Sequence, residues 1–180
     1  GNLLHKFGEF KEAINCFEKA IKINSHQPIP YYNLGNAQKE LGDYQKAKNC
    51  FLKAIEIKSD YIEAHINLGE VFQELGELKK AINCFKQAII IQPNSANAYY
   101  NFGVSLAKLG EYQNAINYFQ KAINLKPDYT RAHSNKLFNL FYLEEVDPKH
   151  YLSQAKKFRL SLKPINSELL LKYQFDVNPK

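Results

Sequence analysis

The chain has 180 residues, of which 45% are hydrophobic, 23% charged and 13% aromatic. This composition is typical of a soluble, core-forming protein and excludes a disordered, collagen-like or low-complexity chain. Its longest apolar runs are far shorter than the ~18 to 20 residues that span a bilayer, so we expect no membrane span. The net charge of +6 does not predict a nucleic-acid partner, because the lysines lie at scattered helix-surface positions beside glutamates, without interleaved stacking aromatics.

The chain repeats itself with a period of ~34 residues. Four segments align without a gap, and they begin at Gly8, Gly42, Gly76 and Gly110. Such a period indicates a stack of structural repeats rather than a globule. In chain order we expect a partial repeat over 1–27, full repeats over 28–61, 62–95 and 96–129, a partial repeat with a capping helix over 130–163, and a short helix and linker over 164–180.

Each unit is expected to hold two helices separated by its glycine. In the unit that begins at Gly76, apolar residues recur at the spacing of one helix face, from Leu78 to Ile89. The glycine is predicted to end the first helix in the left-handed conformation of a C-cap. An acidic residue follows each glycine and favours the N-terminus of the second helix; these residues are Glu9, Asp43, Glu77 and Glu111.

The two ends of the chain depart from the repeat. Gly1 aligns with Gly35 in the middle of a first helix, so we expect further repeats upstream in the natural protein. Towards the other end, Asp147 and Pro148 predict a helix that continues to about Leu162. A cluster of large apolar residues precedes it, and we expect something to cover them; they are Leu137, Phe138, Leu140, Phe141 and Leu143.

The pattern resembles the tetratricopeptide repeat over residues 1 to about 143. The turn glycines carry this resemblance together with the alanines, phenylalanine and proline that recur in each unit, such as Ala81, Phe85, Ala88 and Pro93. The resemblance implies an all-α fold, a right-handed superhelix of helix-turn-helix units ending in C-terminal capping helices. The recurring small and aromatic residues are expected to pack between helices rather than to form a site.

The sequence offers little for catalysis, so we expect no catalytic residues, no metal and no cofactor. The five histidines are not spaced as metal ligands, and His65 and His133 occupy the position of a packing aromatic, which favours a structural role. No glycine-rich phosphate loop is present in the sequence. The chain by itself is therefore predicted not to be an enzyme.

Three cysteines, Cys16, Cys50 and Cys84, are themselves one period apart. Equivalent positions of stacked repeats lie on the order of 10 Å apart, beyond the ~7 Å limit between the Cα atoms of a disulfide. We therefore predict reduced, inert thiols buried between helices and a cytoplasmic location.

An asparagine recurs in the middle of each first helix, at Asn33, Asn67, Asn101 and Asn135. Because asparagine is unfavourable inside a helix, its recurrence in every repeat indicates a structural or functional role. Two readings stay open: a structural hydrogen bond between neighbouring helices, or a grip on the backbone of an extended protein or peptide ligand. Around this ladder we expect a mostly uncharged inner surface with a single basic residue, which argues against an acidic chaperone tail as partner; the surface residues are Tyr32, Asn36, Gln73, Asn97, Tyr100 and Arg131.

Residues 130–159 and the terminal VNPK resemble the join between repeats and catalytic region in bacterial relatives of protein O-GlcNAc transferase. His133, Ser134 and Asn135 match that join, whereas Lys136 departs from it. The resemblance implies that the asparagine ladder holds acceptor proteins, and that a nucleotide-sugar-binding domain follows in the natural protein. The alternative is a scaffold without an associated enzyme that self-associates end to end through its apolar ends.

Overall fold

The computed structural model describes residues 2–143 and 148–161, and these form helices joined by short turns, without a strand. The helices are α1 (Asn2–Ile23), α2 (Pro28–Glu40), α3 (Tyr44–Ile57), α4 (Ile62–Glu74), α5 (Leu78–Ile91), α6 (Ala96–Lys108), α7 (Tyr112–Leu125), α8 (Thr130–Phe141) and α9 (Pro148–Ser161). None of them is both long and apolar enough to span a bilayer. The short helix predicted after residue 164 lies outside the described residues.

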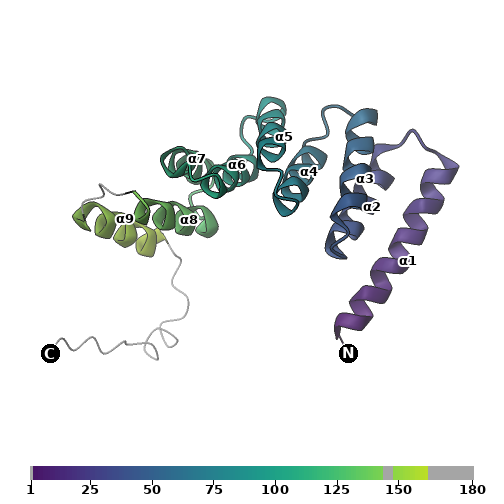
Figure 1. Cartoon of the computed structure of the whole chain (residues 1–180), viewed down its shortest axis with the longest axis horizontal. Helices are drawn as coiled ribbons and strands as arrows, with labels where there is room; N and C mark the ends of the chain where they lie inside the picture. Colours follow the sequence, from purple (N-terminus) through teal and green to yellow (C-terminus); the bar gives the residue numbers. More distant parts are fainter. Residues whose placement is uncertain (1, 144–147, 162–180) are drawn as a thin grey trace.

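The helices form antiparallel pairs, α2 with α3, α4 with α5 and α6 with α7, stacked in a row that twists along its length (Figure 1). The first helices of neighbouring repeats also contact each other, α2 with α4, α4 with α6 and α6 with α8, whereas the described second helices have no such mutual contacts. The first helices therefore line the inner side of the curve. The predicted all-α repeat solenoid is confirmed.

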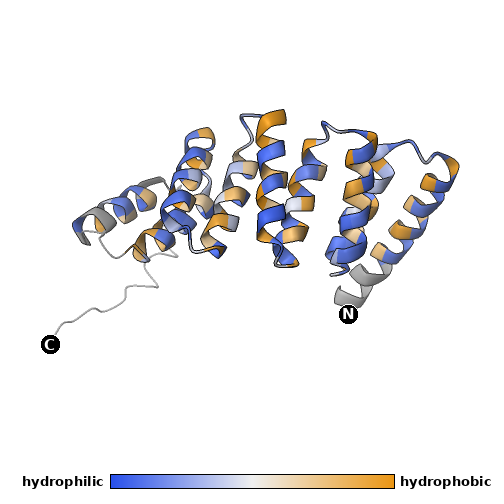
Figure 2. Cartoon of the chain, turned by 45° about the horizontal axis from the view of Figure 1, so that its top comes forward, coloured by the Kyte–Doolittle hydropathy of each residue, from blue (hydrophilic) through white to orange (hydrophobic). Residues whose placement is uncertain are grey.

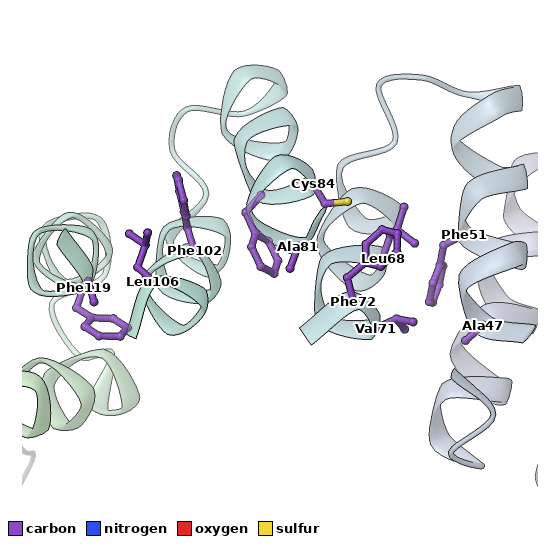
Figure 3. Packing of buried hydrophobic residues seen from close by; sticks show 12 residues of the cluster. Ala47, Phe51, Leu68, Val71, Phe72, Ala81, Cys84, Phe102, Leu106 and Phe119 are labelled. Carbon is purple, nitrogen blue, oxygen red and sulfur yellow. The ribbon is translucent and has the colours of Figure 1, made fainter. Parts of the chain in front are cut away.

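The small and aromatic residues of the repeat make the close contacts between helices. Phe51, Phe85 and Phe119 are fully buried, and Figure 3 shows Phe51 and Phe119 within the row of side chains that fills the space between successive helices. A Cβ built on Gly69 would lie 2.5 Å from the ring of Phe85, so glycine is required where the phenylalanine crosses the first helix. Each helix accordingly shows an apolar stripe beside a polar one (Figure 2).

The turns inside the three full repeats follow the prediction. Gly42, Gly76 and Gly110 have φ values of 78°, 75° and 80°, in the left-handed region that favours glycine. The acidic residue after the glycine is the N-cap of the second helix, but only the side chain of Asp43 accepts a hydrogen bond there, from the backbone N of Lys46 at 3.3 Å.

Gly8 departs from this pattern, and the predicted turn there is wrong. Gly8 and Glu9 both lie inside α1, which continues from Asn2 to Ile23 without a break. In the full repeats a first helix of 13 residues folds back on its partner, and the burial gained offsets the loss of helical hydrogen bonds at the turn. Gly8 lies within a helix and therefore does not take the left-handed turn conformation of Gly42, Gly76 and Gly110 in this structure.

At the other end α9 covers one side of α8. The rings of His133 and Phe158 stack with centroids 5.4 Å apart, and Lys136 Nζ lies 3.1 Å from Gln154 Oε1. The apolar cluster of α8 is covered only in part: Leu140 is 6% exposed, whereas Phe138 and Phe141 are 61% and 74% exposed.

Candidate functional site

The inner face is hollowed along its middle by an open groove of about 570 Å³, which we call the inner groove. Its walls are side chains of the first helices α2, α4, α6 and α8, joined by Tyr44 of α3. The lining residues are Lys39, Glu40, Tyr44, Glu70, Gln73, Glu74, Tyr100, Asn101, Val104, Lys108 and Arg131.

Three of the four ladder asparagines donate hydrogen bonds to the preceding first helix. Asn67 Nδ2 donates to Asn36 Oδ1 at 2.6 Å and to the Tyr32 hydroxyl at 3.3 Å. Asn101 Nδ2 donates to Glu70 Oε1 at 3.2 Å, and Asn135 Nδ2 to the Tyr100 hydroxyl at 3.1 Å.

These bonds join consecutive repeats along the inner face, as the structural reading of the ladder predicts. They use only the amide nitrogens. Within the described part of the chain the side-chain oxygens of Asn67, Asn101 and Asn135 accept no hydrogen bond from the protein.

The predicted inner-surface residues differ in their relation to the groove. Tyr100 and Arg131 line the inner groove, and the Tyr100 ring packs 5.0 Å from that of Tyr129, whose burial raises the pKa of its hydroxyl to about 12. Of the four ladder asparagines, Asn101 lines the groove. The other predicted residues except Gln73 are not among its lining residues; these are Asn33, Asn67, Asn135, Tyr32, Asn36 and Asn97. Gln73 lines the groove, but it is 9% exposed and its amide donates to Asn101 O and Ser105 Oγ of α6.

The expectation of a mostly uncharged inner surface is wrong. Lys39, Lys108 and Arg131 give the groove three positive charges, and Glu40, Glu70 and Glu74 give it three negative charges, so the lining carries both signs in balance. The signal was available in the sequence, because Glu70 stands one period after Asn36 and so occupies an inner-surface position of the next repeat.

Glu70 is the centre of this charged network. Its Oε2 lies 2.7 Å from Lys39 Nζ, and its Oε1 accepts the bond from Asn101. The Lys39 and Glu70 side chains are 21% and 35% exposed, so solvent screens this ion pair only in part.

The predicted structural histidines pack between repeats. His65 Nε2 lies 2.9 Å from Ser59 O, and His133 Nε2 lies 2.9 Å from Pro127 O, so each ring joins its helix to the preceding turn. Among the residues that the structure describes, no group of three or more His, Cys, Asp or Glu is placed to hold a metal ion.

The three thiols differ in exposure, so the prediction that all three are buried is wrong for Cys16. Cys84 is buried in the core, Cys50 is half-buried beside Leu34 and Tyr31 of α2, and Cys16 is exposed. Burial raises the pKa of Cys50 to about 11 and of Cys84 to about 12. Cys16 is exposed because the residues that would fold back over it continue α1 instead.

Comparison with known families gives a match over most of the chain. A model described as "TPR repeat" matches residues 1–42 and 35–76, and one described as "Tetratricopeptide repeat" matches residues 60–128. Together the two models cover residues 1–128. Among curated proteins none matches the chain significantly.

Solved structures share the same architecture. The crystal structure of MamA superposes with a TM-score of 0.80 at 24% identity, over 92% of this chain and 93% of MamA, a likeness that shows the fold alone. YrrB, described as a TPR protein with an unusual peptide-binding site, has a TM-score of 0.72 at 25% identity, over 95% of this chain and 87% of YrrB. An O-GlcNAc transferase mutant from Thermobaculum terrenum has a TM-score of 0.68 at 26% identity, over 74% of this chain but only 26% of the transferase.

Proposed function

Because the chain belongs to the tetratricopeptide repeat family, we propose that its inner groove binds an extended segment of a partner protein. The observation that carries this proposal is the asparagine ladder along the first helices. Each ladder amide that bonds the preceding helix keeps an unused acceptor oxygen. Backbone N–H groups of an extended segment are the donors that such oxygens can accept, whatever the side chains of the segment.

The spacing of the ladder supports the same reading. Helix packing places equivalent positions on the order of 10 Å apart, and an extended chain advances ~3.3 Å per residue. A segment that enters the groove at Asn101 and continues along the first helices would therefore pass one ladder asparagine about every three residues. The balanced charge of the groove favours a neutral or mixed-charge segment over a strongly acidic or basic one.

The experiment compares two pairs of asparagines. A displayed library of random twelve-residue peptides is selected against the wild-type chain, and the selected peptides serve as probes. We expect Asn67→Ala with Asn101→Ala to weaken their binding by ~1 to 3 kcal/mol while circular dichroism shows an unchanged helix content. The matched control is Asn83→Ala with Asn117→Ala, which replaces two exposed asparagines of the second helices.

Two outcomes would contradict the proposal. A double variant of the ladder that melts at a lower temperature but binds normally would make the ladder purely structural. A library from which no binding peptide is selected would contradict the proposal that the groove is a ligand-binding site.

A second candidate function is a scaffold that self-associates end to end. It is favoured by apolar side chains left exposed near both ends of the described solenoid, such as Ile23 at 86% and Phe141 at 74%. Exposed apolar area of this kind promotes contact between copies. Light scattering over a range of protein concentrations tests it, and a constant monomer mass would count against the scaffold.

We also propose, more specifically, that the chain acts together with a glycosyltransferase. It is supported by the resemblance of residues 130–159 and by the likeness to 26% of the chain of the Thermobaculum terrenum transferase mutant. The check is whether proteins captured from a lysate by the groove carry O-linked GlcNAc in mass spectrometry, and captured proteins without it would contradict the association. The free thiols fit a reducing cytoplasmic compartment for this function.

A further inference from the structure

The inner groove crosses the first helices obliquely. Its lining begins at Glu40, the last residue of α2, and includes Glu74, the last residue of α4. On α6 it extends from Lys108 back to Tyr100, and on α8 it reaches Arg131, the second residue of that helix. A segment bound along the groove therefore has one end at α2 and the other at α8.

The charges of the groove are unevenly distributed between these ends. Lys39 and Glu70 neutralise each other, because Lys39 Nζ and Glu70 Oε2 form an ion pair at 2.7 Å. The charged lining residues that remain are exposed and, within the described part of the chain, form no hydrogen bond or ion pair through their side chains; they are Glu40, Glu74, Lys108 and Arg131. Two acids thus stand on α2 and α4, which we call the acidic end, and two bases on α6 and α8, which we call the basic end.

Three of these four residues oppose the dipoles of their own helices. Glu40 and Glu74 lie at the C-termini of α2 and α4, where the partial charge of a helix is negative, and Arg131 lies in the first turn of α8, where it is positive. Lys108, at the C-terminus of α6, is the exception. Like charge at a helix end is unfavourable, so helix stability does not account for these three residues, whereas a charged ligand does.

We propose that the groove selects a segment with ordered charges, with a basic side chain at the acidic end and an acidic side chain at the basic end. The proposal rests on the proposed peptide-binding function and specifies it, since a balanced net charge leaves this order open. Neighbouring first helices lie on the order of 10 Å apart, and an extended chain advances ~3.3 Å per residue. The step from Glu74 to Lys108 spans one repeat and that from Glu74 to Arg131 spans two, so the two charges of the ligand stand about three to six residues apart.

The test reverses the two ends of the groove without changing its net charge. The reversed chain has lysine at both acidic positions and glutamate at both basic positions: Glu40→Lys, Glu74→Lys, Lys108→Glu and Arg131→Glu. Because these side chains are exposed and three of the changes agree with the helix dipoles, we expect circular dichroism to show the helix content and the melting temperature of the wild type.

The probes are the twelve-residue peptides selected on the wild-type chain. Each has a charge-exchanged counterpart, in which Lys and Arg become Glu, and Asp and Glu become Lys. We expect the selected peptides to bind the reversed chain about tenfold more weakly than the wild type, and their counterparts to show the opposite preference. Raising the salt concentration should narrow both differences. Equal binding to the two chains, or selected peptides without charges of both signs, would overturn the proposal.

Single substitutions test the order of the charges. Glu74→Gln should no longer weaken the binding of a peptide whose basic residue is already replaced by glutamine, and Arg131→Gln should behave in the same way towards the acidic residue of the peptide. The matched control is Lys79→Gln, which removes an exposed lysine of α5 outside the groove lining and should leave binding unchanged. Coupling of Glu74 to the acidic residue of the peptide, or of neither variant to either residue, would overturn the order.

The outcomes separate this proposal from the proposed function. If the selected peptides bind the wild-type and reversed chains equally but Asn67→Ala with Asn101→Ala weakens them, the groove binds peptides without reading their charges, and only the present proposal is overturned. If no peptide is selected on the wild-type chain, both proposals are overturned.

Discussion

The full repeats and the first unit have the same sequence pattern but different structures. Phe51 and Phe85 are fully buried, whereas Phe17, at the same position of the first unit, is half-buried. Cys84 is buried, whereas Cys16 is exposed. The residues are the same in each comparison, and the difference is whether a first helix folds back over them. A repeat residue is therefore buried by its neighbouring helix and not by its own place in the period.

The largest effect is expected from removing a buried ring of a full repeat. Phe85→Ala should lower the free energy of unfolding by ~3 to 5 kcal/mol, because it leaves a cavity in the core. Phe17→Ala should cost less than about half of that, since its ring is already partly in solvent. Urea denaturation followed by circular dichroism measures both, and equal losses would mean that the first unit is packed like the others.

The three cysteines should react with a thiol reagent at different rates. At pH 8 we expect Cys16 to react quickly with a thiol reagent in the native protein, and Cys84 only on unfolding. Burial raises the pKa of Cys50 from 9.0 to about 11, which leaves about a hundredfold less thiolate. Mass spectrometry of labelled peptides reads the three rates, and equal rates in the native protein would contradict this order.

The same shifts predict a loss of stability in alkali. The fold favours the neutral thiols of Cys50 and Cys84, so their contribution is complete below pH 9.0 and is lost as the pH rises through about 11 and about 12. Unfolding free energies measured on either side of pH 9 test whether stability falls as the pH rises. Cys84→Ala should make this fall smaller.

Alanine substitutions at two glycines that occupy the same position of the repeat should change the stability in opposite directions. Gly76→Ala is expected to cost ~1 to 2 kcal/mol, because its φ of 75° strains a residue with a Cβ. Gly8→Ala is expected to gain about 0.5 to 1 kcal/mol, since Gly8 lies inside a continuous helix. The melting temperatures of the two variants decide this, and a loss at both positions would indicate a turn at Gly8.

The smallest effect is expected at the exposed apolar ends. Ile23→Ser should change the free energy of unfolding by less than about 0.5 kcal/mol, because Ile23 is 86% exposed. The matched control is Ile123→Ser, which removes an isoleucine that is 8% exposed and should be clearly destabilising. Thermal denaturation compares the pair, and a large loss at Ile23 would show that this end is covered in solution.

The sequence predicted the helices of the full repeats closely, because a constant period fixes the phase of every apolar residue and the position of each turn glycine. It predicted the ladder of Asn67, Asn101 and Asn135, and their bonds to the preceding helix agree with one of its two readings. Their role in peptide binding stays a prediction.

The features that the sequence did not predict depend on contacts between neighbouring helices. The predicted turn at Gly8 was wrong because a period gives the position of a glycine but not the backbone conformation that it adopts; here Gly8 lies inside α1. The charged network of Glu70 arises where consecutive repeats differ at contacting positions. Such differences are visible in an alignment of the repeats, but their effect appears only when the helices are placed side by side.

Glu70 links three repeats at once. Lys39 of α2 bonds one of its carboxylate oxygens and Asn101 of α6 bonds the other, so one side chain bridges α2, α4 and α6. A ligand that bonds Lys39 Nζ or Asn101 Nδ2 would compete with Glu70 for these groups, whereas a donor to Asn101 Oδ1 would leave both bonds of Glu70 in place. If the proposed segment displaces Glu70 from Lys39, occupancy of the inner groove and the spacing of α2, α4 and α6 become coupled properties.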